Sequence, residues 1–81
     1  MTDRTSIFTR ICALIAPLNR RGVTLTETTS FANDLEMDSL TVMDLVANIE
    51  DEWDIVLPLN LLPELETIGQ VADAVTKLAT K

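Results

Sequence analysis

The most concentrated chemistry in the chain lies in residues 34–45, DLEMDSLTVMDL, where Ser39 is surrounded by carboxylates. A serine acts as a nucleophile only when a general base takes its proton. The chain has no histidine, and no lysine lies near Ser39 in the sequence. A Ser-His-Asp triad is therefore excluded. If Ser39 reacts, another enzyme must activate it.

The alternation of Asp34, Glu36 and Asp38 could instead begin a calcium-binding loop. An EF-hand loop that starts at Asp34 needs Gly at its sixth position and Glu at its twelfth. The chain has Ser39 and Leu45 there, so the match fails. A structural zinc site is excluded because the chain has one cysteine and no histidine. We expect no metal and no catalytic centre.

Ser39 lies at the start of a predicted helix that runs from about Ser39 to Trp53, with Asp38 as its N-cap. A helix N-terminus presents unpaired N–H groups and the positive end of the macrodipole, which favour a negatively charged group. The position alone leaves two interpretations open. Ser39 is an ordinary helix-start residue, or it is the point where a phosphodiester is attached.

The same predicted helix has two apolar faces on a helical wheel of about 100° per residue. The wider face is predicted to be buried and consists of Val42, Leu45, Val46, Ile49 and Trp53. The opposite face carries a narrower set, here called the outward strip, which consists of Leu40, Met43 and Ala47. The acidic residues interleaved with this strip are Asp44, Asp51 and Asp54. An apolar strip rimmed by carboxylates is typical of a docking surface, although scattered apolar surface residues are also common.

Two further helices are predicted from apolar periodicity and end signals. The first is capped by Thr2 or Asp3 and ends near Pro17 and Asn19. Its apolar positions are Ile7, Phe8, Ile11, Leu14, Ile15 and Leu18. The last helix begins at Thr67, which forms a capping-box pattern with Gln70. Its apolar positions are Ile68, Val71, Ala72, Val75, Leu78 and Ala79.

The segments between the predicted helices differ in length. A long polar loop follows the first helix and is predicted to turn four apolar side chains inward, namely Val23, Leu25, Phe31 and Leu35. Loops of this length in a small domain are uncommon and often functional. Pro58 and Pro63 leave room for only a short helical turn between them.

The composition is consistent with a small all-α bundle. Eighty-one residues suit a single domain covering residues 1–81. A hydrophobic fraction of 47% supports a compact core, while two glycines and no tyrosine argue against a many-stranded sheet. The single cysteine, Cys12, permits no internal disulfide, so a reducing cytoplasm is expected, with Cys12 a buried structural thiol. The N-terminal apolar stretch is interrupted by Arg10 and is interpreted as a helix, not a signal peptide.

The charge distribution indicates what the protein binds. The net charge is −7, and residues 22–76 contain acidic residues but no Lys or Arg. Such a surface repels phosphate backbones and anionic lipid heads, so no nucleic acid and no membrane insertion are expected. It attracts basic patches on partner proteins, although a merely solubilising surface has the same composition. We expect a monomer.

Residues 34–45 resemble the phosphopantetheine attachment region of acyl carrier proteins, with Asp38-Ser39-Leu40 at its centre. The resemblance continues through VANIEDEWDIVLP, residues 46–58, which has an acidic helix end, an aromatic residue and a following Ile/Pro segment. It extends more weakly over the first helix, the long loop and TIGQVADAV, and so covers essentially the whole chain.

This resemblance implies a small four-helix bundle of acyl-carrier type, with a long first loop and a short third helix. It implies that Ser39 carries 4′-phosphopantetheine, attached by a phosphopantetheinyl transferase that uses coenzyme A. Acyl chains then travel as thioesters on this arm between acyl-loading and acyl-accepting enzymes with basic docking patches, and the protein itself is not an enzyme. The implied partner-binding residues are Asp38, Leu40, Met43, Asp44, Ala47, Glu50 and Asp51. The implied acyl pocket involves Leu45, Val46, Ile49, Leu61 and Leu62.

One departure from the family concerns residues 59–63, LNLLP, which are apolar where carriers of primary fatty-acid biosynthesis usually continue with acids. This difference favours a dedicated secondary lipid pathway, of sphingolipid or polyketide type, at least as strongly as housekeeping fatty-acid synthesis. Two alternatives stay open. One is an acidic helical adaptor without a prosthetic group. The other is a peptidyl or aminoacyl carrier, in which Gly or His more often precedes the serine.

Overall fold

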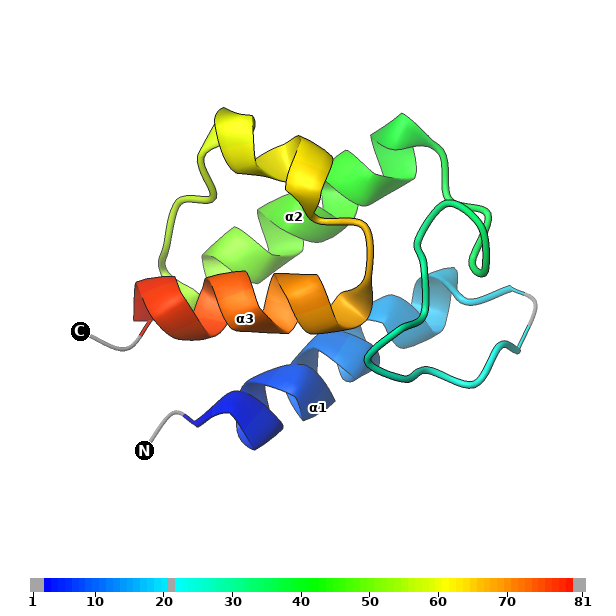
Figure 1. Ribbon diagram of the computed structural model, residues 1–81, viewed down its shortest axis with the longest axis horizontal. Helices are drawn as coiled ribbons and strands as arrows, with labels where there is room; N and C mark the ends of the chain where they lie inside the picture. The colour runs from blue at the N-terminus through cyan, green and yellow to red at the C-terminus, as the bar shows by residue number, and fades with distance from the viewer. Residues whose placement is uncertain (1–2, 21, 80–81) are drawn as a thin grey trace.

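A computed structural model describes residues 3–20 and 22–79, apart from the side chains of Leu59 and Leu62. The chain folds into three α-helices, namely α1 (Arg4–Ile15), α2 (Ser39–Trp53) and α3 (Ile68–Ala79). Two 3₁₀ helices, η1 (Ala16–Leu18) and η2 (Leu59–Glu64), lie between them (Figure 1). The described residues form no β-strand, only an isolated bridge between Ser30 and Thr67. The predicted all-helical class is confirmed.

The predicted caps account for where α1 and α2 begin. The Asp3 carboxylate accepts a hydrogen bond from the Ser6 amide at 2.8 Å, which satisfies one free N–H group of the first turn of α1. Thr2, the other predicted cap, lies outside the described residues. The α-helix stops at Ile15 and continues through Pro17 as the 3₁₀ turn η1. The bounds of α2 are those that the sequence predicts.

The predicted capping box at the start of α3 is present. The backbone N–H of Gln70 donates to Thr67 Oγ1 at 3.3 Å, and the backbone N–H of Thr67 donates to the side-chain oxygen Oε1 of Gln70 at 2.9 Å. This reciprocal pair satisfies two backbone N–H groups and fixes the first helical residue as Ile68.

The segment between the prolines forms a 3₁₀ helix instead of an α-helix. It begins with a hydrogen bond from the Leu61 amide to the Pro58 carbonyl, at 3.0 Å. Pro63 lies inside η2 and has no N–H group to donate. The described chain therefore has three α-helices, and the expected four-helix count is not confirmed; the 3₁₀ helix η2 lies where the resemblance implies a short third helix.

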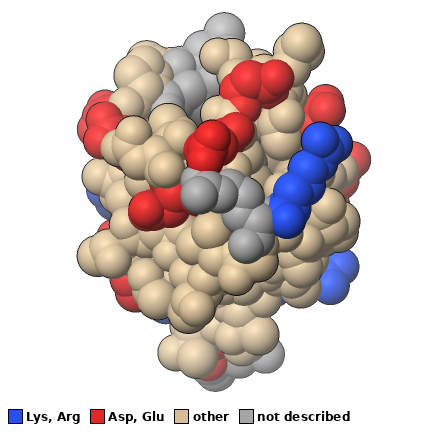
Figure 2. Space-filling model, turned by 90° about the vertical axis from the view of Figure 1, so that its right-hand side faces the viewer, with Lys and Arg blue, Asp and Glu red and all other residues tan. Residues whose placement is uncertain are grey.

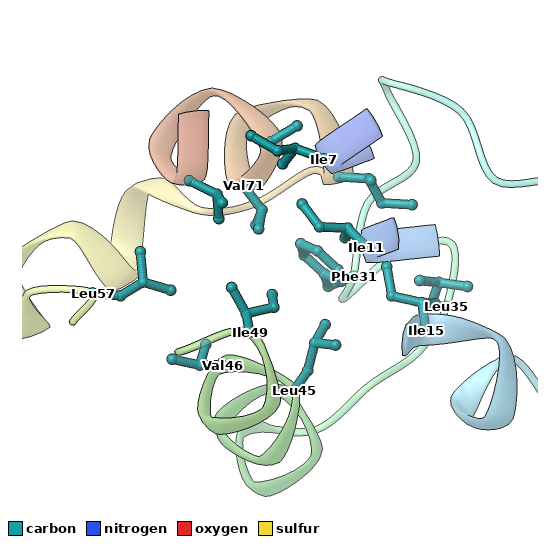
Figure 3. Packing of buried hydrophobic residues seen from close by; sticks show 13 residues of the cluster. Ile7, Ile11, Ile15, Phe31, Leu35, Leu45, Val46, Ile49, Leu57 and Val71 are labelled. Carbon is teal, nitrogen blue, oxygen red and sulfur yellow. The ribbon is translucent and has the colours of Figure 1, made fainter. Parts of the chain in front are cut away.

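The hydrophobic core is shared by all three helices and by the long loop (Figure 3). Seven side chains are almost completely buried, namely Ile7, Ile11, Ile15, Leu45, Ile49, Ile68 and Val75. Phe31 and Leu35 are buried as predicted, and Val23 and Leu25 are half-buried against the core. Cys12 is half-buried, and this burial raises the pKa of its thiol, which keeps it protonated.

An ionic cluster, here called the Arg4 clamp, holds the long loop against α3. The Arg4 guanidinium donates to both carboxylate oxygens of Glu27 and, at 2.6 Å, to Asp73. The Gly69 amide donates to the Glu27 carbonyl at 2.9 Å. The loop backbone comes this close because Gly69 has no Cβ, which would lie 2.8 Å from the Glu27 carbonyl oxygen.

Candidate functional site

Ser39 is the first residue of α2, and its side chain is exposed. The residue before it, Asp38, has extended backbone angles and caps the helix by accepting a hydrogen bond from the Thr41 amide at 2.8 Å. The remaining N–H groups of the first turn face the same end as Ser39. A serine so placed is accessible to another enzyme and suits a negatively charged substituent.

The pKa of the Asp38 carboxyl is set mainly by its role as the helix cap. The hydrogen bond from the Thr41 backbone lowers the pKa of its carboxyl below the ordinary value of 3.8. Asp38 is therefore ionised at neutral pH and offers an acceptor, not a proton.

The two predicted faces of α2 are found in the structure, although Val42 and Trp53 of the face predicted to be buried are only half-buried. Leu45, Val46 and Ile49 are buried in the core, and Figure 3 shows them directed from α2 toward the other elements. Leu40 is 76% exposed and Met43 is 46% exposed. Ala47 and the interleaved acids Asp44, Asp51 and Asp54 are exposed as well. The outward strip is thus an exposed apolar surface rimmed by carboxylates.

Glu50 has a structural partner that the sequence did not reveal. It is half-buried, and its Oε2 accepts a hydrogen bond from the Leu57 amide at 2.8 Å. Its backbone carbonyl accepts a hydrogen bond from the Ile55 amide at 3.1 Å. Glu50 therefore holds the turn after α2, while the other predicted partner-binding residues are exposed.

Carboxylates are also prominent around the end of the molecule where α2 begins (Figure 2). Figure 2 looks at the end where α2 begins and the long loop folds back, and carboxylates spread over the upper part of this face. Asp34 belongs to this loop and accepts a hydrogen bond from the Ser30 amide at 2.7 Å. Residues 3–20 and 22–79 include no group of three or more His, Cys, Asp or Glu side chains that could hold a metal ion.

A groove of about 560 Å³ opens beside Ser39. Three segments form its walls: residues 30–33 of the loop, residues 37–43 around the start of α2, and residues 63–66 before α3. Its apolar lining includes Phe31, Met37, Val42, Met43 and Leu65. The groove has the size of a small-molecule site, and sequence reasoning did not identify it because its walls are far apart in the chain.

The residues implied for the acyl pocket lie in different surroundings. Leu45, Val46 and Ile49 are part of the closed core. Leu61 is half-buried and lines a second groove, between η2 and α3. The side chain of Leu62 lies outside the described part of the structure.

The fold and the site define a class: a small acidic helical protein that presents one serine at a helix N-terminus, beside a groove and an exposed apolar strip. Comparison with known families is consistent with this class. Residues 9–75 match the family described as "Phosphopantetheine attachment site".

Individual relatives give the same result. The chain is 37% identical over 83 aligned positions to an acyl carrier protein of Saccharopolyspora erythraea, covering 96% of this chain and 87% of that protein. It is 33% identical over 64 positions to an acyl carrier protein of Porphyromonas gingivalis, covering 79% and 82%. It is 33% identical over 61 positions to a probable acyl carrier protein of Caulobacter vibrioides, covering 75% and 71%.

The chain therefore belongs to the acyl carrier protein family, whose prosthetic group is 4′-phosphopantetheine and whose members carry acyl groups without catalysing a reaction. Such carriers interact with a phosphopantetheinyl transferase and with acyl-handling enzymes. No helix in the described ranges is long and apolar enough to cross a membrane.

Proposed function

We propose that residues 1–81 form a single carrier domain in which Ser39 holds 4′-phosphopantetheine through a phosphodiester on its Oγ. The observation that carries this proposal is the exposed position of Ser39 as the first residue of α2, directly after the capping Asp38. The cap occupies the Thr41 amide and leaves other N–H groups of the first turn to face the phosphate.

The proposed role of the outward strip is to receive the enzymes that act on the arm. Leu40 and Met43 supply exposed apolar contact area within the first helical turn after Ser39. Asp44 and Asp51 supply negative charge that steers basic patches toward them. Asp38 and Ala47 complete this docking face, with Glu50 contributing mainly by holding the end of α2 in place.

The groove beside Ser39 is the proposed resting place for the arm when no partner holds it. Its apolar lining suits the methylene and methyl groups of the arm, and its position at Ser39 makes the binding intramolecular. Longer acyl chains would continue toward the core side chains Leu45, Val46 and Ile49, which must then move apart. Leu61 and Leu62 on η2 are the further candidates for this contact.

The proposed pathway is a dedicated secondary lipid route of sphingolipid or polyketide type, in the cytoplasm. Its support is the character of η2, which represents the family's short third helix and whose sequence is Leu59-Asn60-Leu61-Leu62-Pro63-Glu64. Partners that use this segment would meet a surface with few acids.

Intact mass measurement tests the attachment directly. The protein is incubated with coenzyme A, magnesium and a promiscuous phosphopantetheinyl transferase. The expected result is a gain of one phosphopantetheine in the wild type and none in Ser39→Ala. An unchanged mass in a wild-type sample with a helical circular dichroism spectrum contradicts the proposal. That outcome would favour an acidic adaptor that binds through the outward strip alone.

A further inference from the structure

Three large apolar side chains are exposed in the described part of the chain, namely Leu40, Met43 and Val56. The first two belong to the outward strip. Val56 is 76% exposed and lies beyond the end of α2, outside every surface assigned so far.

Two hydrogen bonds to Glu50 hold the backbone after α2, where Val56 faces outward. Asp54 adopts the left-handed conformation, with φ 53° and ψ 51°, which is uncommon for a residue other than glycine. The Ile55 and Leu57 amides are both bound by Glu50, at 3.1 and 2.8 Å. Ile55 is half-buried and Leu57 is buried, whereas Val56 between them faces solvent.

Val56 belongs to a shallow groove of about 420 Å³, here called the distal surface, whose walls present polar atoms as well as apolar side chains. The groove is lined by Trp53, Asp54, Ile55, Val56, Leu78 and Ala79. Figure 1 shows the ends of α2 and α3 at one end of the molecule, with the start of α2 at the other. Because α2 has 15 residues, its ends are separated by about 22 Å. A protein bound at the distal surface therefore leaves Ser39 accessible.

The charges around the distal surface indicate its occupant. Asp51, Glu52 and Asp54 lie in or just after the last turn of α2, and Asp51 and Asp54 also rim the outward strip, while the last turn of α3 contributes the cation Lys77. Arg10 pairs with Glu52 at 3.1 Å, while no ion pair involves Asp51 or Asp54 among the described residues. Anionic lipid and a second copy of this chain, with its net charge of −7, are both repelled. The complementary occupant is a protein segment that carries an apolar side chain flanked by Lys or Arg.

We propose that the distal surface is a second docking site, which binds a basic, apolar segment of another protein while the outward strip and Ser39 serve a different enzyme. Val56 is the apolar contact at this site, and Asp54 is its charged neighbour. The site does not depend on attachment of the arm, so its test is independent of the mass measurement.

The chain contains a built-in probe for this site. Trp53 is its only tryptophan, and it has no tyrosine, so fluorescence emission excited at the indole band reports on the distal surface. The full-length protein is titrated with a short synthetic peptide of leucines and arginines, and separately with a peptide of leucines and glutamates. We expect saturable change in Trp53 emission with the basic peptide only. The same response is expected in Ser39→Ala.

Two substitutions separate apolar contact from simple charge attraction. Val56→Asp adds a negative charge, which alone would strengthen binding of a basic peptide, but it removes the apolar contact; we expect about tenfold weaker binding. Asp54→Asn keeps a residue that tolerates the left-handed backbone and should bind several-fold more weakly, with less dependence on salt.

Leu40→Asp is the matched control, because it places the same charge at an equally exposed position on the outward strip. It should leave the Trp53 response unchanged. Binding of the basic peptide by Val56→Asp as tightly as by the wild type would overturn the proposal. So would loss of the Trp53 response in Leu40→Asp, or a lack of any response in the wild type.

Discussion

The Asp38 carboxylate accepts a hydrogen bond from the Thr41 amide at 2.8 Å, and this contact fixes Ser39 as the first residue of α2. Asp38 thus has two separable properties: its oxygen accepts the hydrogen bond that starts the helix, and it places a negative charge beside Ser39. The interaction also accounts for the lowered pKa of Asp38.

Substitutions at Asp38 should separate these two properties. Asp38→Asn keeps an oxygen that can accept the Thr41 hydrogen bond but removes the charge, whereas Asp38→Ala removes both. We expect urea unfolding to move to lower denaturant in Asp38→Ala and to change little in Asp38→Asn. If the charge also guides the transferase, both variants should gain phosphopantetheine more slowly by mass spectrometry. Equal destabilisation of the two variants would show that the hydrogen bond from the Thr41 amide does not contribute to stability.

Truncation of a buried side chain on α2 should lower the free energy of unfolding far more than truncation of a side chain on its outward strip. Ile49 is fully buried, so Ile49→Ala should lower the free energy of unfolding by about 2–5 kcal/mol. Leu40 is exposed, so Leu40→Ala should change it by less than about 0.5 kcal/mol. Chemical denaturation measures the free energy of unfolding of both variants. A large decrease in Leu40→Ala would mean that the assignment of the two faces is wrong.

Gly69 should resist replacement because of its contact with the long loop. A Cβ there would lie 2.6 Å from Glu27 Oε1 and 2.8 Å from the Glu27 carbonyl oxygen. Although alanine favours a helix over glycine by about 1 kcal/mol, we expect Gly69→Ala to be destabilising by about 1–3 kcal/mol. In a Glu27→Ala background, which lacks the Arg4–Glu27 ion pair and the side-chain clash, Gly69→Ala should be less destabilising than in the wild type, but still destabilising because the carbonyl clash remains. A neutral or stabilised Gly69→Ala would refute the close contact.

The Arg4 clamp should give stability a defined dependence on pH. Its hydrogen bonds lower the pKa of Glu27 below the ordinary 4.5. A lowered carboxyl pKa contributes stability above the unfolded value, and this contribution is lost as the pH falls through the folded value. Wild type should therefore be more stable than Arg4→Met at pH 7, and the difference should shrink below about pH 4.5. A difference that is constant from pH 7 to pH 3 would exclude the ion pair as its cause.

Charge reversal at an acidic residue that rims the outward strip should slow docking of a basic partner. We expect Asp44→Lys to reduce the association rate with the transferase several-fold at low salt, and added salt to weaken wild-type association similarly. Glu64→Lys on η2 is the matched control, with the same change in net charge. If stopped-flow measurements find equal slowing in both variants, net charge and not the strip directs docking.

The features that the sequence predicts well are those encoded by neighbouring residues. Asp38 and the apolar periodicity determine α2, and Thr67 with Gln70 determines the start of α3. In both cases the decisive contacts span only three or four residues. The form of η2 is harder to predict, because two prolines permit either a single α-turn or a 3₁₀ helix.

The groove beside Ser39 and the Arg4 clamp depend instead on distant residues. Phe31, Met43 and Leu65 meet only after the loop folds onto α2 and α3. Arg4 and Asp73 are joined across nearly the whole chain. The hydrogen bond from the Leu57 amide to the Glu50 carboxylate likewise forms only once the chain has turned after α2. No local pattern specifies such contacts, so a single sequence reveals the serine and its helix but not the groove.

The arrangement of the helices has a mechanical consequence for a protein that must take up cargo. The backbones of α1 and α3 approach one another most closely, whereas α2 stands further from α3 and rests on large side chains such as Leu45 and Ile49. Displacing α2 therefore disturbs side-chain packing more than it disturbs backbone contacts. Ser39 therefore lies on the α-helix that is held to the other two mainly by side-chain packing.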